Sequence, residues 1–131
     1  PRGITVSSFA SVSLTPPLVL VCIMKQARAH QAIDSGHFVV NVLAEDQGVV
    51  SEHFASPDLS SEEQFEGYDK LRLRGCLGYL DCKVVDRIRV ADHTIFVGEV
   101  QQADVGKEGK KPLLFFSGGY WGLSSRVYER G

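Results

Sequence analysis

Residues 79–90, YLDCKVVDRIRV, decide the fold class of this chain because apolar and polar side chains alternate along them. A period of two places successive side chains on opposite faces of an extended chain, as in a half-buried β-strand. One face takes Leu80, Cys82, Val84, Ile88 and Val90, and the other takes Asp81, Lys83, Arg87 and Arg89. Residues 94–105, TIFVGEVQQADV, follow a turn at Ala91-Asp92 and predict the partner strand of a long hairpin.

The segments that flank this hairpin are short and mostly strand-like. Leu18–Met24 and His37–Leu43 are apolar on both faces, which is typical of buried central strands. Gly3–Phe9 is compatible with a strand, and Pro112–Phe116 predicts the last one. Because regular helices do not separate these segments, we expect an antiparallel barrel of about five or six strands with short helical decorations.

Two short helices are predicted between the strands. In the first, Ala29, Ala32 and Ile33 recur at helical spacing. In the second, Glu45-Asp46 suit the first turn. Its apolar face would hold Val49, Val50, His53 and Phe54. Residues 55–69, ASPDLSSEEQFEGYD, predict a long surface loop with Glu62-Glu63 as a solvated pair, and residues 106–111 predict a turn.

The composition is that of a globular protein without a strong charge bias. The chain has 131 residues, of which 44% are hydrophobic, with 14 Lys and Arg against 16 Asp and Glu. This length predicts one domain over residues 1–131, and the formal charge of −2 leaves no basic excess for nucleic acid or a membrane surface. Because residue 1 is Pro and not Met, we expect the chain to be part of a longer protein.

The cysteines and histidines predict neither a disulfide framework nor a metal site. Cys22, Cys76 and Cys82 are an odd number and form no C-x-x-C pair, which favours reduced thiols in a cytoplasmic protein. The histidines show no metal-ligand spacing, so we expect no bound metal. They are His30, His37, His53 and His93.

A stripe of hydroxyl side chains runs along residues 5–13. In an extended chain, Thr5, Ser7, Ser11 and Ser13 share one face, while the even positions are mostly apolar and are expected to face the core. Hydroxyl groups both donate and accept hydrogen bonds, so the stripe suits the lining of a polar ligand. The alternative is the solvent face of an edge strand.

Two further segments could contact a ligand. Residues 25–30, KQARAH, join a buried strand to a helix, and backbone N–H groups there, with Lys25 and Arg28, suit a phosphate. An ordinary polar loop explains the same residues equally well. Asp92-His93 lies at the tip of the long hairpin, where the histidine is either a surface residue or a functional one.

Several blocks of the chain, in order, carry a resemblance to a known family. They are Thr5–Cys22, Phe38–Ala44, Ser51–Ala55, Asp92–Val100 and Pro112–Phe116. These blocks resemble the flavin reductase family with the FMN-binding split-barrel fold. Its members are the small reductase components of two-component flavin-dependent monooxygenases.

The resemblance implies a mainly β fold, an antiparallel split β-barrel that works as a homodimer. It implies an oxidoreductase in which NAD(P)H reduces bound FMN or FAD, and the reduced flavin then serves a partner oxygenase. A non-catalytic flavin-binding or electron-carrier protein on the same fold is the alternative. A domain in which the hydroxyl stripe faces water and binds nothing is a further one.

The resemblance also assigns roles to residues. The isoalloxazine and ribityl chain would be lined by Thr5, Val6, Ser7, Ser8, Ser11 and the Val12 backbone. The phosphate end would be held by Lys25, Ala27, Arg28, Ala29 and His30. Phe54 would lie along the flavin or its adenosine part. His93, the catalytic residue, would orient the nicotinamide without shuttling protons, and Tyr120 is a second candidate beside it.

Three departures from the family pattern stand out. The helix and strand that usually precede the Gly3 segment are absent, so we expect the chain to be truncated at its N-terminus. Ala29 stands where Ser or Thr is frequent, which removes one possible phosphate hydroxyl. Ala91 replaces the usual Gly before Asp92-His93.

Overall fold

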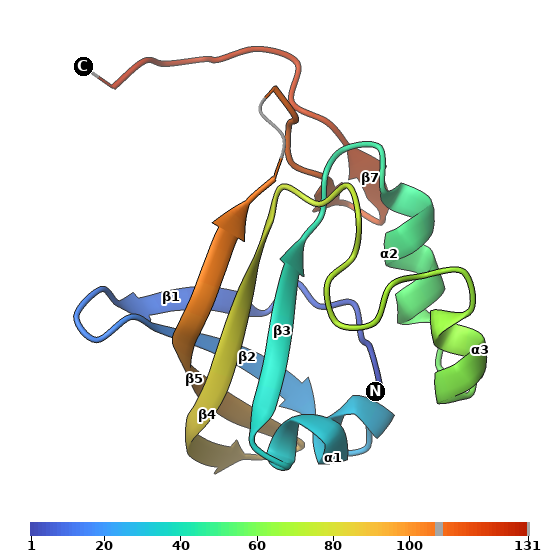
Figure 1. Ribbon diagram of the computed structural model, residues 1–131. Coiled ribbons are helices and arrows are strands. Elements are labelled where there is room, and N and C mark those ends of the chain that lie inside the picture. The colour runs from blue at the N-terminus through green and yellow to red at the C-terminus, as the bar shows by residue number, and fades with distance from the viewer. Residues whose placement is uncertain (107–108, 131) are drawn as a thin grey trace.

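The computed structural model describes residues 1–106 and 109–130 and is mainly antiparallel β-structure (Figure 1). The main sheet has the strand order β1-β2-β5-β4-β3. Its strands are β1 (Phe9–Ser13), β2 (Leu18–Met24), β3 (His37–Val42), β4 (Gly78–Val90) and β5 (His93–Val105). A separate hairpin contains β6 (Leu114–Phe116) and β7 (Gly119–Trp121). The helices are α1 (Arg28–Asp34), α2 (Gly48–Ala55) and α3 (Ser61–Phe65).

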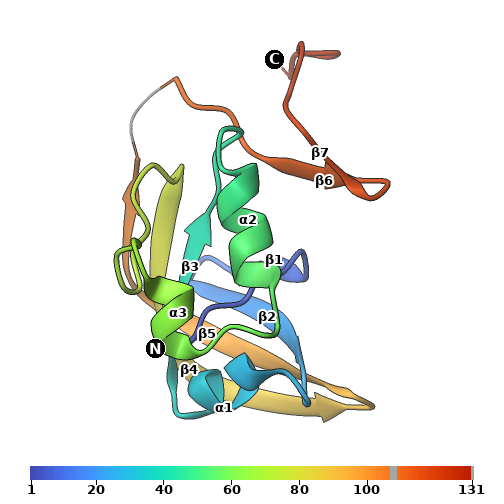
Figure 2. The same ribbon diagram turned by 90° about the vertical axis from the view of Figure 1, so that its right-hand side faces the viewer.

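The hydrophobic core lies between the inner face of the sheet and α1. Phe96 is fully buried, and Val21 of β2 and Phe96 of β5 face each other across the register. Ala29 and Ile33 bring the apolar side of α1 into this core. Gly98 is required here, because a Cβ atom would lie 2.6 Å from the Phe38 ring. Figures 1 and 2 show α1 at one end of the sheet, with α2 and α3 together at its side.

The long β4–β5 hairpin is confirmed, but one of its predicted faces is wrong. The register shifts between Val84 and Asp86, where β4 contains an extra residue. Such a bulge moves every following side chain to the other face of the sheet. Ile88 and Val90 therefore lie opposite Ile95 and His93 on the outer face, where they are 44% and 50% exposed.

The first strand begins later and is more exposed than the sequence suggests. The predicted Gly3–Phe9 strand is wrong in extent, because residues 3–8 form no regular strand and β1 starts at Phe9. The expectation that the even positions face the core is also wrong, since Val6 and Val12 are 38% and 49% exposed. The reason is the place of β1 at the edge of the sheet, paired with β2 alone.

The second helix also differs from its prediction. It begins at Gly48 and not at Glu45-Asp46, because the buried Gln47 holds the preceding turn. The Gln47 side chain accepts a hydrogen bond from the Ala44 N–H (2.8 Å) and donates one to the Arg74 carbonyl (2.9 Å). Val49, expected on the apolar face, is 79% exposed.

Two other segments differ from their predictions: the loop at residues 55–69 contains a helix, and the strand at residues 112–116 is followed by another strand. The expected loop at residues 55–69 contains α3, which Ser60 caps and in which Glu62-Glu63 occupy the exposed first turn. Pro112–Phe116 is not the last strand, since its residues Leu114–Phe116 pair with β7. The predicted turn at residues 106–111 includes 107 and 108, which lie outside the described residues.

Candidate functional site

The strand register brings three of the predicted segments together. The Ser8 carbonyl accepts a hydrogen bond from the Cys22 N–H (3.1 Å), so the chain before β1 runs beside the end of β2. Met24, the last residue of β2, lies opposite His93, the first residue of β5. The Lys25 N–H donates to the Asp92 carbonyl (2.8 Å). The segment with the hydroxyl stripe, the start of α1 and the hairpin tip are therefore neighbours along the backbone of β2, and we call these three segments the strip. Ser11 pairs with Val19 of the inner face, whereas His93 pairs with Met24 of the outer face.

The hydroxyl groups of this strip fall into two sets. Thr5 donates to the Ser51 carbonyl (2.6 Å), and Ser8 donates to the Cys22 carbonyl (2.8 Å). These two side chains therefore fix the backbone of the N-terminal segment. Ser7 and Ser11 are exposed, and their side chains form no hydrogen bond within the described part of the chain. Their hydroxyl groups are open to a ligand.

The start of α1 offers its backbone to a ligand, while the side chains of Ala29 and His30 point elsewhere. Ala27 is the N-cap, in an extended conformation and with no capping side chain. Ala29 is 2% exposed and faces the core, so only its backbone is available. The His30 Nε2 lies 2.8 Å from the Thr94 hydroxyl, and its ring packs edge-on against Phe96. The His30 side chain thus belongs to the sheet and not to the ligand side.

His93 is exposed at the tip of the long hairpin and has a fixed ring orientation. Its Nδ1 lies 2.8 Å from the Asp92 carboxylate, and its side chain is 42% exposed. The hydrogen bond from His93, followed by the charge of His93, lowers the pKa of Asp92 below its ordinary value. A carboxylate on one ring nitrogen fixes the tautomer and leaves the rest of the ring to face a ligand.

Phe54 does not reach the strip. It is 7% exposed and packs against Phe65 and Tyr68, each with 5.3 Å between ring centroids. Gly3 crosses directly over it, since a Cβ atom on Gly3 would lie 2.6 Å from the Phe54 ring. Phe54 therefore supports the N-terminal segment from below.

Ser51 is a residue of the site that sequence reasoning missed. It is 3% exposed, accepts from Thr5 through its carbonyl and accepts from the Tyr120 hydroxyl through its own Oγ (2.8 Å). Ser51 therefore holds both Tyr120 of β7 and Thr5 of the N-terminal segment at the same point of α2. The sequence placed Ser51 in a family block but gave no sign that it joins these two residues.

Gln64 is the second residue that was missed. It is fully buried, accepts from the Gly3 N–H (2.7 Å) and donates to the Gly3 carbonyl (2.8 Å). These two bonds hold the chain just before Thr5 against α3. Because the two residues are 61 positions apart, no local pattern in the sequence could indicate the contact.

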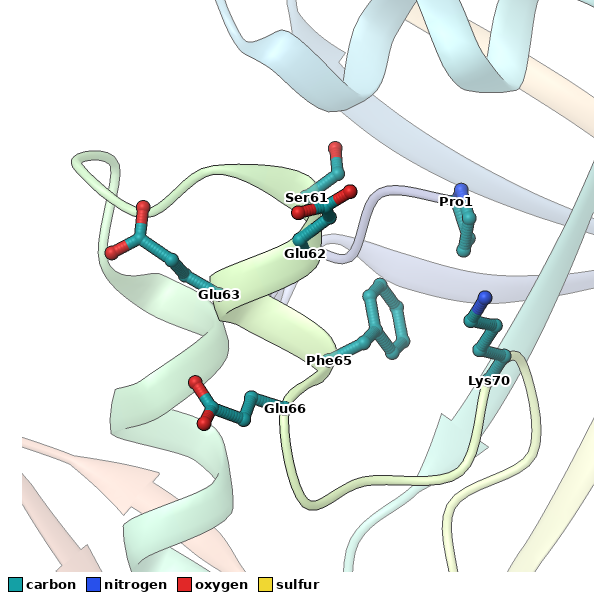
Figure 3. A pocket seen from close by; sticks show the side chains of 7 residues that line it. All are labelled: Pro1, Ser61, Glu62, Glu63, Phe65, Glu66 and Lys70. Carbon is teal, nitrogen blue, oxygen red and sulfur yellow. The ribbon is translucent and has the colours of Figure 1, made fainter.

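Two open cavities lie beside the N-terminus, between α1 and α3. One, of about 480 Å³, faces α3, and Figure 3 shows its Phe65 ring and Lys70 turned toward Pro1. Its lining residues are Pro1, Ser61, Glu62, Glu63, Phe65, Glu66 and Lys70. The other, of about 510 Å³, faces α1 and includes Arg28, the one predicted site residue that lines either cavity.

The sequence profile of the flavin reductase like domain matches residues 1–124 of the chain. The chain belongs to this family. Its fold is the split barrel of the flavin reductases, mainly β with antiparallel sheets and few helices. No helix of this flavin reductase domain, within the described residues, has the length and apolar character to cross a membrane. Across the same residues, no three His, Cys, Asp or Glu side chains gather in a way that could hold a metal ion.

Relatives of this flavin reductase domain are known in sequence and structure. It is 39% identical over 132 residues to the reductase subunit HsaB of a flavin-dependent monooxygenase from Mycobacterium tuberculosis, covering 94% of this chain and 69% of that protein. It is 42% identical to the FMN reductase (NADH) SmoA of Agrobacterium fabrum, covering 96% of this chain and 73% of that protein. The NADH:FAD oxidoreductase SgcE6 of Streptomyces globisporus, in complex with NAD and FAD fragments, superimposes with a TM-score of 0.87 at 34% identity, covering 98% and 81%.

The donors present in the strip fit a flavin nucleotide. The open hydroxyls of Ser7 and Ser11 and the backbone of the β1 edge match the neutral polar atoms of the ring and ribityl chain. Lys25 and Arg28 supply the positive charge that a phosphate requires. Ala27 and Ala29 offer backbone only, and the side chains of His30 and Phe54 serve the scaffold.

Proposed function

We propose that the chain is an NAD(P)H:flavin oxidoreductase that reduces FMN or FAD and supplies reduced flavin to a partner monooxygenase. The observation that carries the proposal is that backbone pairing along β2 makes neighbours of the segment with the hydroxyl stripe, the segment that begins at Lys25, and the hairpin tip at His93. Family membership supports it, as do relatives named as the reductase subunit of a monooxygenase and as NADH-dependent reductases of FMN and FAD.

The protein binds and orients, while the cofactor supplies the redox chemistry. When bound, a flavin would supply the hydride-accepting chemistry, with the nicotinamide as the donor. Ser7, Ser11 and the Val6 and Val12 backbone line the ring and ribityl region. Lys25 and Arg28 hold the phosphate, for which charge-assisted hydrogen bonds are the strong ones. Thr5 and Ser8 keep this lining in place through their bonds to the Ser51 and Cys22 carbonyls.

His93 orients the nicotinamide and shuttles no proton. Asp92 holds its Nδ1, so the imidazole presents a fixed edge and face beside Lys25. Replacing His93 with Ala should raise the NADH KM by about tenfold, the loss of roughly 1.4 kcal/mol of positioning. Asp92→Asn keeps a hydrogen bond to the His93 Nδ1 without the negative charge and should cause a smaller rise in the NADH KM. An H93A enzyme with unchanged NADH KM and unchanged reduction rate would rule out this role.

The function itself has a direct test. The visible spectrum of the purified protein reports bound flavin, and the loss of NADH or NADPH absorbance with added FMN, FAD or riboflavin reports the activity. A protein that holds flavin tightly but oxidises neither nucleotide is the electron-carrier alternative. A protein that is colourless, shifts no flavin spectrum and oxidises neither nucleotide is neither an enzyme of this class nor a carrier.

We also propose that the chain works as a homodimer. The bulge in β4 leaves the outer face of the sheet apolar, with Met24, Ile88 and Val90 between 44% and 50% exposed. Half-buried apolar neighbours, Leu20 and Ile95, extend this outer face across β2 and β5. A contiguous apolar face of this kind is typical of a subunit interface.

We propose a cytoplasmic location. The support is the state of the cysteines: Cys22, Cys76 and Cys82 are free, and burial raises the pKa of the Cys82 thiol to about 11. Protonated, buried thiols of this kind persist where the surroundings are reducing. Fractionation of the native cells, with an antibody against this chain, should find it in the cytoplasmic fraction, and recovery from the exported fraction would contradict the proposal.

A further inference from the structure

The β6–β7 hairpin stands apart from the main sheet. It forms a separate two-stranded sheet, and Figure 2 shows it projecting sideways beyond α2. Phe116 and Trp121 are 70% and 57% exposed, so the hairpin adds little to the core. Within the described part of the chain, one side-chain hydrogen bond joins it to another element, from the Tyr120 hydroxyl to the Ser51 Oγ (2.8 Å). Because a two-stranded hairpin is marginally stable alone, its position depends on this bond and on the chain that leads into it.

Tyr120 docks the hairpin on one face of α2. Its half-buried ring packs edge-on against Phe115, with 5.4 Å between ring centroids. The ring also lies over Gly48, where a Cβ atom would be 3.8 Å from it. Gly48 and Ser51 are three positions apart and therefore share one face of the helix. Since Ser51 is 3% exposed, its bond from the Tyr120 hydroxyl is shielded from water.

Ser51 is at the same time an anchor of the N-terminal segment. Its carbonyl accepts a hydrogen bond from the Thr5 hydroxyl (2.6 Å). Further along this segment, the Ser8 hydroxyl donates to the Cys22 carbonyl (2.8 Å). Ser7, whose hydroxyl is open to a ligand, lies between these two anchors, one to α2 and one to β2. Weakening the Thr5 anchor would therefore let Ser7 move relative to α2.

We propose that Tyr120 is a positioning residue for flavin binding. Through Ser51 it keeps Thr5 anchored, and the anchored Thr5 holds the Ser7 hydroxyl where it meets the flavin ring and ribityl chain. The inference rests on the proposed function, because it assumes that residues 5–8 line the flavin. Since coupling between two places in a protein is reciprocal, a flavin that favours the anchored segment also favours the docked hairpin. A direct contact of Tyr120 with the nicotinamide is the competing role, which the experiment distinguishes.

The first test removes one phenol hydroxyl at a time. Dissociation constants for FMN and riboflavin, which share the ring and ribityl chain, are measured by fluorescence quenching in the wild type, Tyr120→Phe and Tyr128→Phe. Tyr128 is 81% exposed in the C-terminal segment, so Y128F is the matched control. In Y120F both dissociation constants should rise by about fivefold, the size expected for one neutral hydrogen bond, while the NADH KM at saturating FMN stays within about twofold. Y128F should bind both flavins as the wild type does.

A double-mutant cycle shows whether the effect passes through Thr5. Thr5→Val removes the hydroxyl that bonds to the Ser51 carbonyl and keeps the shape of the side chain. In the T5V background, Y120F should change the dissociation constants by less than about twofold, because the bond through which it acts is already gone. Full multiplication of the two effects overturns the inference. Ser51→Ala keeps the carbonyl but loses Oγ, so it should match Y120F and serves in its place if Y120F folds poorly.

The second readout is amide hydrogen exchange in the hairpin, which needs no turnover. Saturating FMN should slow exchange at residues 114–121 in the wild type and in Y128F, because flavin binding and hairpin docking favour each other. The same addition should leave exchange in the Y120F hairpin unchanged. Protection that persists in Y120F would mean that the flavin stabilises the hairpin by another route, and it overturns the inference.

The remaining outcomes separate this inference from the proposed function. Equal flavin affinities in Y120F and the wild type overturn the inference and leave the proposed function standing. A rise in the NADH KM of Y120F without a change in flavin affinity does the same and assigns Tyr120 to the nicotinamide. A loss confined to FMN, with riboflavin unaffected, places the effect at the phosphate and also overturns the inference. A wild type that binds no flavin overturns the proposed function as well.

Discussion

Ala91, at the turn of the long hairpin, adopts a backbone conformation that suits glycine. Its φ angle is +51°, in the left-handed region, where a Cβ atom costs about 1–2 kcal/mol. This explains physically why the family pattern has Gly before Asp92-His93, although the sequence showed only the departure. The chain tolerates the strain because the two 13-residue strands on either side of the turn pair along their length, from Val90 opposite His93 to Gly78 opposite Val105.

The first prediction is therefore that Ala91→Gly stabilises the protein. The free energy of unfolding, measured by urea denaturation, should rise by about 1 kcal/mol because the strain is released. Ala103→Gly is the matched control, since Ala103 lies on the extended strand β5, where Gly should lower stability by about 0.5–1 kcal/mol. Equal losses of stability in both variants would contradict the assignment of strain to Ala91.

A second prediction concerns the His30–Thr94 pair, which joins α1 to β5. Thr94 is fully buried, and its hydroxyl lies 2.8 Å from the His30 Nε2. Thr94→Val keeps the shape but leaves the ring nitrogen half-buried without its partner, which should cost about 1–2 kcal/mol of unfolding free energy. A double-mutant cycle with His30→Leu should give a coupling energy of about 1 kcal/mol. Additive losses would show that the two side chains do not interact.

At the scale of elements, the sequence predicted strand identity well and strand faces less well. The apolar runs that became β2 and β3 and the alternation in β4 and β5 each reflect a local pattern, which a sequence displays directly. The bulge in β4 was not predicted, although the adjacent Val84 and Val85 break the alternation and give a local sign of it. Its effect on Ile88 and Val90 depends on the pairing with β5, which only the fold supplies.

In the candidate site, too, the features that depend on local sequence could be predicted and those that depend on distant contacts could not. The places of Lys25, Arg28 and His93 in the fold could be predicted because they stand at or beside the ends of recognisable strands and helices. Ser51 and Gln64 could not, because each acts through a contact with a residue 46 or 61 positions away. The sequence also could not show that the side chains of His30 and Phe54 point into the protein, because packing in the fold determines which neighbours a side chain contacts. The extent of β1 was overestimated because Gly3 and Thr5 bond to α3 and α2 and not to a strand.

The third prediction concerns α3, whose capping box combines Ser60 and Glu63. The Glu63 N–H donates to the Ser60 hydroxyl and the Ser60 N–H donates to the Glu63 carboxylate, both at 3.1 Å. Hydrogen bonds first from the Ser60 backbone and then from its side chain lower the pKa of Glu63. A lowered folded-state pKa means that the cap contributes fully above the unfolded pKa and is lost as the pH falls through the folded value.

Titration of the Glu63 carboxyl by NMR tests this cap. In Ser60→Ala the pKa of Glu63 should rise toward its ordinary value, and amide protection in α3 should fall, because the hydroxyl bond is gone. Ser61→Ala is the control, since Ser61 takes no part in the box. The same rise in both variants would show that the pKa shift has another origin. Because Gln64 of α3 clamps Gly3, S60A should also loosen the segment that carries Thr5.

At the scale of the whole molecule, the sheet has one face in the core and one exposed face with apolar side chains. The inner face is closed by Phe96 and α1, whereas the outer face exposes Met24, Ile88 and Val90. The hairpin tip that carries His93 lies at the border of this outer face, because Val90 is directly opposite His93. A second copy on the outer face would therefore stand next to the proposed nicotinamide position, so dimerisation and ligand binding should be linked.

The fourth prediction follows from this geometry. Ile88→Glu places a charge in the middle of the outer face and should convert the proposed dimer into a species of 14.4 kDa in sedimentation equilibrium. Val105→Glu is the control, because Val105 is an 82% exposed position at the far end of the same hairpin and should leave the mass at twice that value. Both positions tolerate a polar group in the monomer, since each is already open to water. If I88E stays dimeric, the outer face is not the interface. If it becomes monomeric and keeps the wild-type NADH KM, the interface is real but the site is complete within one chain, and the link between the two is wrong.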